Sequence, residues 1–105
     1  MEILIKNLRF EKPQFEYQVR VDRASILGNP YFMHNESERD EVCDRYKTYF
    51  YQQFNGNETF REAVRKLYRI AKHYGRLELF CWCAPKRCHA ETIRNCLMKY
   101  FKEEN

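Results

Sequence analysis

The most constraining feature of the sequence is a short apolar run between two helical stretches. Residues 77–83 lie between Gly75 and Pro85 and are rich in leucine and aromatic side chains. A run of this length with turn signals at both ends is typical of a strand buried on both faces, as in the interior of a parallel sheet. We therefore expect the fold to be built around this strand.

The segments on either side have the periodicity needed to complete such a sheet. The predicted elements are strands over residues 3–8 and 16–22 and helices over residues 37–54, 59–74 and 89–102. Ser37 and Thr59 are the expected N-caps, and Gly75 is the expected stop of the second helix. The order strand, strand, helix, helix, strand, helix predicts an α/β fold with a small, mainly parallel sheet covered by three helices.

Length and composition indicate one domain over residues 1–105. The chain is 44% apolar and 16% aromatic, which suffices for a core without disulfide bonds. Its net charge of +4 gives a mild preference for phosphates, far below the charge of a dedicated nucleic-acid binder. No segment has the features of a signal peptide or the length of a membrane span, so we expect a cytoplasmic protein with reduced cysteines.

Potentially reactive side chains gather where the central strand turns into the last helix. Cys83 follows the strand, and Cys88 and His89 stand at the helix start. Ligands of open α/β sheets bind beyond the carboxyl ends of strands, near free backbone N–H groups. A thiol at a helix N-terminus near cations ionises more readily than a free one. We therefore predict catalytic roles for Cys88 and His89 and a ligand-binding role for Cys83.

Two other interpretations of these side chains stay open. Together with Cys81 they match a zinc ligand set, but residues two apart on a strand lie roughly 6.6 Å apart, whereas zinc-bound sulfurs lie at most about 4.6 Å apart. Cys88 and His89 also leave a helix in directions about 100° apart. The second interpretation is that these cysteines only fill space and that His89 only caps the helix. We therefore assign no metal ligand and require no cofactor, with zinc as the alternative.

The remaining cysteines and the tryptophan fit the core better than a site. Cys96 lies on the apolar stripe of the last helix, and Cys43 and Cys81 receive the same interpretation. Trp82 is expected in the core rather than as a platform for stacking a base.

A loop of about a dozen residues follows the second predicted strand. We predict ligand binding by Arg23, Ser25, Gly28 and Asn29, because a cation, a hydroxyl, a flexible glycine and an amide stand just beyond a strand end. Arg39 joins this set, since a cation in the first turn of a helix is unfavourable unless a negative group lies nearby. The alternatives are ordinary turn chemistry for the loop and a solvated arginine balanced by neighbouring carboxylates.

Residues in three segments carry a family resemblance. They are 19–23 (Val-Arg-Val-Asp-Arg) with Ser25 and 28–30 (Gly-Asn-Pro), 37–41 (Ser-Glu-Arg-Asp-Glu) with Tyr46, and 81–85 (Cys-Trp-Cys-Ala-Pro) with Cys88-His89. They resemble the bacterial and phage family called domain of unknown function 4326, although Ala90 stands where that family tends to have glycine. The resemblance implies an uncharacterised protein of phage or bacterial cytoplasm with a Rossmann-like, nucleotide-binding fold.

These observations lead to one functional hypothesis and one alternative. The hypothesis is a pocket for a nucleotide or another phosphorylated small molecule, formed by the two loops, with a Cys/His-dependent hydrolase or transferase reaction if the protein is an enzyme. The alternative is a non-enzymatic phage or bacterial interaction module that binds nucleic acid or a host protein, with structural zinc or purely structural cysteines. Both depend on whether the arginine loop and the thiol segment meet at one edge of the sheet.

Overall fold

The computed structural model describes residues 2–104. Its elements in chain order are β1 (Glu2–Asn7), β2 (Gln18–Arg20), the 3-10 helix η1 (Glu36–Glu38), α1 (Arg39–Gly56), α2 (Glu58–Tyr74), β3 (Arg76–Cys81) and α3 (Ala90–Glu104). The predicted order of strands and helices is confirmed, with η1 as an addition before α1. The α/β class, the parallel sheet and the three helices are confirmed as well.

β3 is the central strand of the three-stranded sheet and pairs in parallel with β1 on one side and β2 on the other. Its residues from Leu77 to Cys81 are all buried, as expected for an interior strand. Because the strands are parallel, their carboxyl ends lie at one edge of the sheet. The connections that follow them therefore begin side by side.

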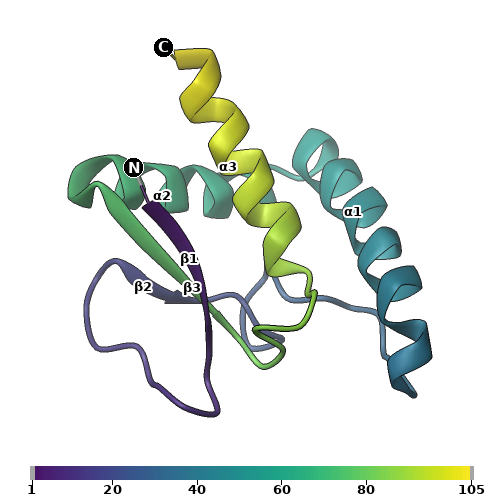
Figure 1. Cartoon of the computed structure of the whole chain (residues 1–105). Coiled ribbons are helices and arrows are strands. Elements are labelled where there is room, and N and C mark those ends of the chain that lie inside the picture. Colours follow the sequence, from purple (N-terminus) through teal and green to yellow (C-terminus); the bar gives the residue numbers. More distant parts are fainter. Residues whose placement is uncertain (1, 105) are drawn as a thin grey trace.

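The helices pack against the face of the sheet that carries Leu77, Leu79 and Cys81, because these residues share one core cluster with side chains of α1, α2 and α3. In Figure 1, α3 crosses in front of α2 and α1 lies beside both. Phe80 alternates to the other face and is also buried. The connection from β1 to β2, residues 8–17, contains no helix.

Two strands end two residues earlier than the sequence predicts. Strand 16–22 is reduced to Gln18–Arg20, and the carbonyl of Val21 accepts a hydrogen bond from His89 Nε2 at 2.5 Å. Strand 77–83 ends at Cys81, after which the indole Nε1 of Trp82 donates to Asp22 at 2.9 Å. Both strands thus end where their residues are engaged by side chains from another segment.

The predicted N-caps were wrong by two residues each, whereas the predicted stop is confirmed. Asn35 and not Ser37 caps the first helical segment, and its side chain accepts from the Ser37 N–H. Asn57 caps α2 in the same manner. Gly75 ends α2 with φ of 69°, the left-handed conformation that favours glycine.

Within residues 2–104, no helix is both long enough and apolar enough to cross a membrane.

Candidate functional site

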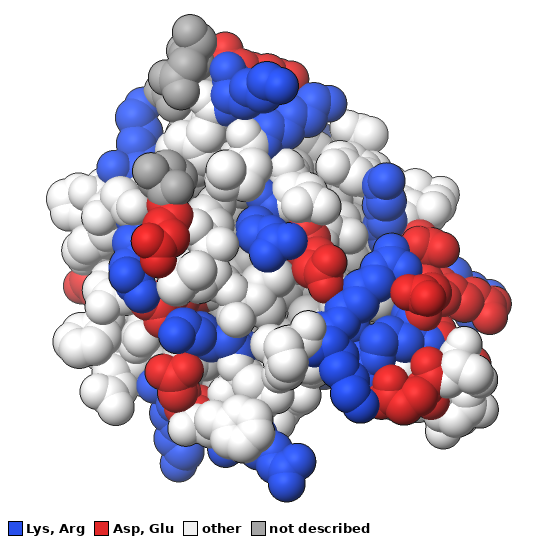
Figure 2. Space-filling view, in the orientation of Figure 1, with Lys and Arg blue, Asp and Glu red and all other residues white. Residues whose placement is uncertain are grey.

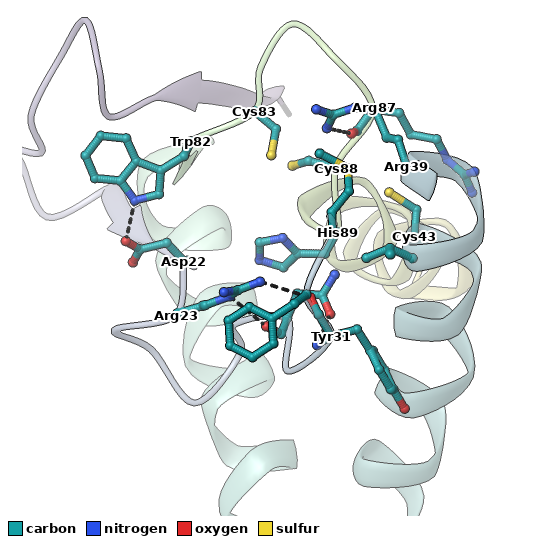
Figure 3. A pocket seen from close by; sticks show the side chains of 14 residues that line it. Asp22, Arg23, Tyr31, Arg39, Cys43, Trp82, Cys83, Arg87, Cys88 and His89 are labelled. Carbon is teal, nitrogen blue, oxygen red and sulfur yellow. Dashed lines mark hydrogen bonds between the residues drawn. The ribbon is translucent and has the colours of Figure 1, made fainter. Parts of the chain in front are cut away.

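A cavity of about 380 Å³ lies at the carboxyl edge of the sheet, between the connection after β2, the start of α1 and the segment that joins β3 to α3. Figure 3 shows side chains from these three parts of the chain pointing into a common space. The arginine loop and the thiol segment therefore meet, as the functional hypothesis requires. The expected residues that line the cavity are Arg23, Asn29, Arg39, Cys83, Cys88 and His89.

Ser25 and Gly28 are not among the residues that line this cavity. The Ser25 hydroxyl accepts a hydrogen bond from the N–H of Leu27 at 3.0 Å, so it supports the turn. A Cβ atom at Gly28 would lie 2.5 Å from the carbonyl oxygen of Asp22 and 2.6 Å from Cα of Arg23. Gly28 thus allows the loop to close on its own backbone, and its expected approach to a ligand stays a prediction.

Arg23 is held in place by the loop that it precedes. Its Nε donates to the carbonyl of Asn29 at 3.2 Å and its Nη2 to that of Tyr31 at 2.9 Å. The guanidinium also stacks on the ring of Phe32, with 4.1 Å between Cζ and the ring centroid. Within residues 2–104 the structure records no ion pair between Arg23 and a carboxylate, and Arg23 is one of the residues that line the cavity.

Arg39 lines the cavity, but the protein itself occupies its guanidinium. Nε and Nη2 donate to the Glu36 carboxylate, each at 2.8 Å, and Nη1 donates to the carbonyl of Arg87 at 2.8 Å. This fork lowers the pKa of Glu36 to about 2. The negative group near the helix start is therefore Glu36 from η1, and Arg39 joins α1 to the segment before α3.

Three thiols meet at the end of β3. The Sγ atoms of Cys81 and Cys88 are 3.1 Å apart, and the sulfur of Cys83 faces that of Cys88 (Figure 3). Cys81 and Cys88 are buried, with 1% and 4% of their surface exposed, whereas Cys83 is only half-buried. Cys83 is the most exposed member of the group, and both Cys83 and Cys88 line the cavity.

The pKa of Cys88 is shifted in the direction opposite to the sequence-based expectation. Hydrogen bonds to Cys81 and Cys83, together with burial, raise the pKa of Cys88. The hydrogen bond from Cys88 lowers the pKa of both neighbours, but one thiol proton serves one acceptor at a time. Arg39 lies beside Cys83 and lowers its pKa further. These directions favour the thiolate at Cys83 and the protonated thiol at Cys88.

His89 is buried and fixed. Its Nε2 donates to the carbonyl of Val21, and its ring lies edge-on to Tyr46 with 4.9 Å between centroids. Burial lowers the pKa of His89, so the ring is neutral. Because Nε2 already donates to Val21, the neutral ring can only accept a further hydrogen bond, at Nδ1.

Sequence reasoning missed the aromatic rim of the cavity. Trp82, expected in the core, is 58% exposed, and Phe32 is 69% exposed. Tyr31 and Asp22 also line the cavity. Asp22 is held by Arg20, which lowers its carboxyl pKa, and it accepts from the Trp82 indole. One sequence signal could have indicated this rim. Residues 20–23 (Arg-Val-Asp-Arg) stand at one predicted strand end, and Trp82 stands at another.

The expectation that the remaining cysteines lie in the core agrees with the structure. Cys43, Cys81 and Cys96 are buried. Arg61, Arg65 and Arg69 on α2 pair with glutamates of the same helix. On the face in Figure 2, blue and red side chains border one another, so the net charge does not gather into one large basic area there.

No group of three or more His, Cys, Asp or Glu side chains in residues 2–104 has a geometry that can hold a metal ion.

The comparison with protein families shows to which family the chain belongs. The model of the family described as domain of unknown function 4326 matches residues 6–99 of the 105-residue chain. The chain belongs to this family. The resemblance noted in the sequence is thus confirmed. Neither a curated protein nor a solved structure matches the chain significantly. The description of the domain of unknown function 4326 family assigns no function to its members.

Proposed function

We propose that the chain binds a nucleotide or another phosphorylated small molecule in the cavity between the loops after β2 and β3. The observation behind this proposal is that one cavity is lined both by Arg23 and by exposed aromatic rings. Arg23 is held by backbone carbonyls and the ring of Phe32, and no ion pair is recorded for it among the described residues. A cation suits a phosphate, and flat rings suit a base or another planar group. One cavity thus offers a cation for the phosphate and aromatic rings for the base of a nucleotide.

The anion-binding side of the proposal rests on how Arg23 is held. Two of its nitrogens are fixed by backbone carbonyls and its plane is supported by Phe32. A guanidinium oriented in advance loses little side-chain entropy when an anion binds. Nη1 is the nitrogen left to contact a phosphate oxygen.

The planar side of the proposal rests on Trp82 and Phe32. Large aromatic side chains are normally well buried, yet both are more than half exposed beside the same cavity. The hydrogen bond from Trp82 to Asp22 fixes the indole. A fixed, exposed ring offers stacking at a low cost in conformational entropy.

Size and position agree with this proposal. Small-ligand pockets have volumes of about 300–1,000 Å³, a range that includes the present cavity. The carboxyl edge of a parallel sheet is also where α/β proteins bind ligands, which is the Rossmann-like element of the proposal.

The catalytic part of the hypothesis stays a prediction. Cys88 is buried and retains its proton, and His89 Nε2 is bound to a backbone carbonyl. A Cys/His-dependent hydrolysis or transfer therefore places the thiolate at Cys83, with His89 as a neutral acceptor. The geometry supports ligand binding more directly than it supports a reaction.

The decisive experiment uses Trp82, which is the only tryptophan in the chain and therefore the only source of indole fluorescence. The folded protein is titrated with nucleoside mono- and diphosphates, ribose 5-phosphate and inorganic phosphate. Binding is expected to change the emission saturably and to raise the melting temperature. No response in either measurement across the panel contradicts the proposal.

A pair of variants separates binding at Arg23 from a general effect of charge. Arg23→Ala is expected to weaken binding of a responding ligand by about tenfold or more, because a charge-assisted hydrogen bond is lost. Arg69→Ala removes the same charge from the surface of α2, where Arg69 pairs with Glu62, outside the cavity. Equal weakening by both variants argues for nonspecific attraction.

The second candidate function is a non-enzymatic phage or bacterial interaction module. Phe10 and Phe15, on the connection between β1 and β2, are 75% and 57% exposed, and a partner protein could cover them. A structural zinc belongs to this candidate. Metal analysis of protein purified without chelator tests that point: one zinc per chain, lost in both Cys83→Ser and Cys88→Ser, favours the module over the pocket.

A further inference from the structure

The three thiols at the end of β3 are arranged unequally. The Sγ atoms of Cys81 and Cys88 are in contact at 3.1 Å, and the sulfur of Cys83 faces Cys88 from the cavity side. A disulfide bond is about 2.05 Å long, so only a small approach separates Cys81 and Cys88 from a bond. Cys83 is half-buried and Cys88 is buried, and both line the cavity, whereas Cys81 is buried and is not part of the lining.

The charged groups around Cys83 favour an anionic sulfur. The sulfur of Cys88 faces it, and Arg39 from α1 lies beside it. Glu36 opposes the thiolate, but its carboxylate is already taken by Arg39 and Lys86. The sum of these effects lowers the pKa of Cys83 to about 6. The guanidinium of Arg39 thus favours the thiolate form of Cys83 over that of a free thiol.

The other two cysteines of the chain lack this arrangement. Burial raises the pKa of Cys43, and burial raises that of Cys96 to about 11. Neither has a sulfur contact among the described residues. They serve as internal controls within the same molecule.

We propose that Cys83 and Cys88 form a redox-active thiol pair that reduces a hydroperoxide, with Cys83 as the attacking sulfur and Cys88 as the resolving one. This proposal goes beyond ligand binding and requires no bound nucleotide. Its evidence is the position of one accessible sulfur in front of a buried partner, beside a guanidinium.

The chemistry balances in two steps. The Cys83 thiolate attacks the distal oxygen of the hydroperoxide ROOH, the O–O bond breaks, and the alkoxide leaves and takes up a proton, which gives Cys83–SOH and ROH. The sulfur of Cys88 then attacks the Cys83 sulfur, an S–S bond forms, and hydroxide leaves with the Cys88 proton as water. Two thiols lose two electrons, and the peroxide accepts them.

The position of each sulfur explains the division of roles. Cys83 is the sulfur that a peroxide entering the cavity meets, and Arg39 stabilises its negative charge. Cys88 keeps its proton until Cys83 is oxidised, because burial and its hydrogen bonds disfavour its thiolate. Cys81 contacts Cys88 from behind and can exchange into the disulfide afterwards.

The test is thiol mapping of the reduced full-length chain after brief exposure to stoichiometric hydrogen peroxide. Free thiols are blocked with N-ethylmaleimide, and peptides are identified by mass spectrometry. Trypsin cleaves after Lys86 and Arg87, between Cys83 and Cys88, and chymotrypsin cleaves after Trp82, between Cys81 and Cys83. The two digests together assign the bond without any substitution.

The expected result is a Cys83–Cys88 link at early times, with Cys43 and Cys96 still labelled. Before oxidation, alkylation of Cys83 at pH 7 is expected to be about tenfold or more faster than that of Cys43. The variant Cys88→Ser is expected to stop at sulfenic acid on Cys83, which dimedone traps. Variant folding is checked by circular dichroism, and the wild-type map stands on its own if a variant does not fold.

Three results overturn the proposal. One is oxidation of Cys43 or Cys96 as fast as that of Cys83. Another is sulfinic acid on Cys83 with no disulfide in the wild type. The third is a Cys81–Cys88 link that forms equally fast in Cys83→Ser. Thiol mapping uses no nucleotide, so its failure leaves the binding proposal intact, and an absent nucleotide response leaves the thiol pair intact.

Discussion

Two connections leave the same edge of the sheet, and they are held very differently. The connection after β2 is tied to other elements by buried side chains: His89 from the start of α3 donates to Val21, and the Tyr46 hydroxyl from α1 donates to Leu27 at 2.6 Å. The connection after β1 bonds mostly to itself, as where the Gln18 side chain accepts from Gln14. Exposed phenylalanines mark the latter connection.

This difference explains why the proposed site is at the loop after β2. Position at the carboxyl edge is shared by both connections, so it does not by itself produce an ordered cavity. Buried anchors from α1 and α3 fix one loop at the depth where Arg23 and the thiols meet. The comparison predicts that changes at the anchors cost far more stability than changes in residues 8–17.

The largest effect is expected from Gly28→Ala. The new Cβ would lie 2.5 Å from a backbone oxygen and 2.6 Å from a backbone carbon, and neither atom can move like a side chain. We expect a loss of about 2–3 kcal/mol in the free energy of unfolding, the upper range for overpacking. Urea denaturation followed by circular dichroism measures it.

Gly56→Ala is the matched control for this change. Gly56 ends α1, and a Cβ there meets no atom within 4 Å. Alanine is expected to be neutral or to stabilise by up to about 1 kcal/mol, because it loses less entropy in a helix. If Gly28→Ala is as mild as its control, the loop after β2 is not closed as described.

The next effect in size is expected from Tyr46→Phe. The variant keeps the ring in the core but leaves the carbonyl of Leu27 without its donor, which costs about 1–2 kcal/mol. Tyr74→Phe serves as the control, since that hydroxyl bonds to Glu16 on the exposed surface. Equal stability of the two variants in urea would show that Tyr46 is no anchor.

The sequence predicted the framework of the fold well because the framework depends on local signals. The apolar run at residues 77–83, the stripes of α2 and α3 and the glycine stop at Gly75 act through periodicity and turn chemistry, which a single segment contains. The N-caps were misplaced since asparagine and serine or threonine stood within two residues of one another, and tertiary packing selected Asn35 and Asn57.

The site was predicted in part, and the misses have one physical cause. Arg23, Cys83 and His89 were found because a strand end and a helix start identify them. Trp82 was assigned to the core because hydrophobicity does not show that its indole bonds to Asp22, 60 positions away. Cys88 was expected to ionise more readily than a free thiol, because the sequence alone does not show that its sulfur lies beside those of Cys81, at the end of β3, and Cys83, just after it.

His89 offers a smaller test of the anchors through pH. Burial lowers the pKa of His89 below its ordinary value, with Asp22, Arg23 and Tyr46 as its nearby titratable neighbours. The unfolded chain therefore binds this proton more readily than the folded chain. Stability is expected to be retained above about pH 6.5 and to fall below it, with a slope of at most about 1.4 kcal/mol per pH unit.

The pH test has its own matched pair. Urea midpoints between pH 7.5 and pH 5 are compared for the wild type, His89→Gln and His73→Gln, which alters an exposed histidine. The part of the slope due to His89 should disappear only in His89→Gln. An unchanged slope in that variant would mean that the contact with Val21 tolerates a charged ring.

The smallest effect is expected from Phe10→Ser in the connection after β1. Phe10 is 75% exposed, and its recorded side-chain contact is with the guanidinium of Arg9, 5.8 Å from the ring centroid. A surface substitution of this kind changes the free energy of unfolding by less than about 0.5 kcal/mol. A loss as large as that of Tyr46→Phe would show that residues 8–17 are anchored after all. The contrast between the two connections would then no longer explain why the cavity lies beside β2.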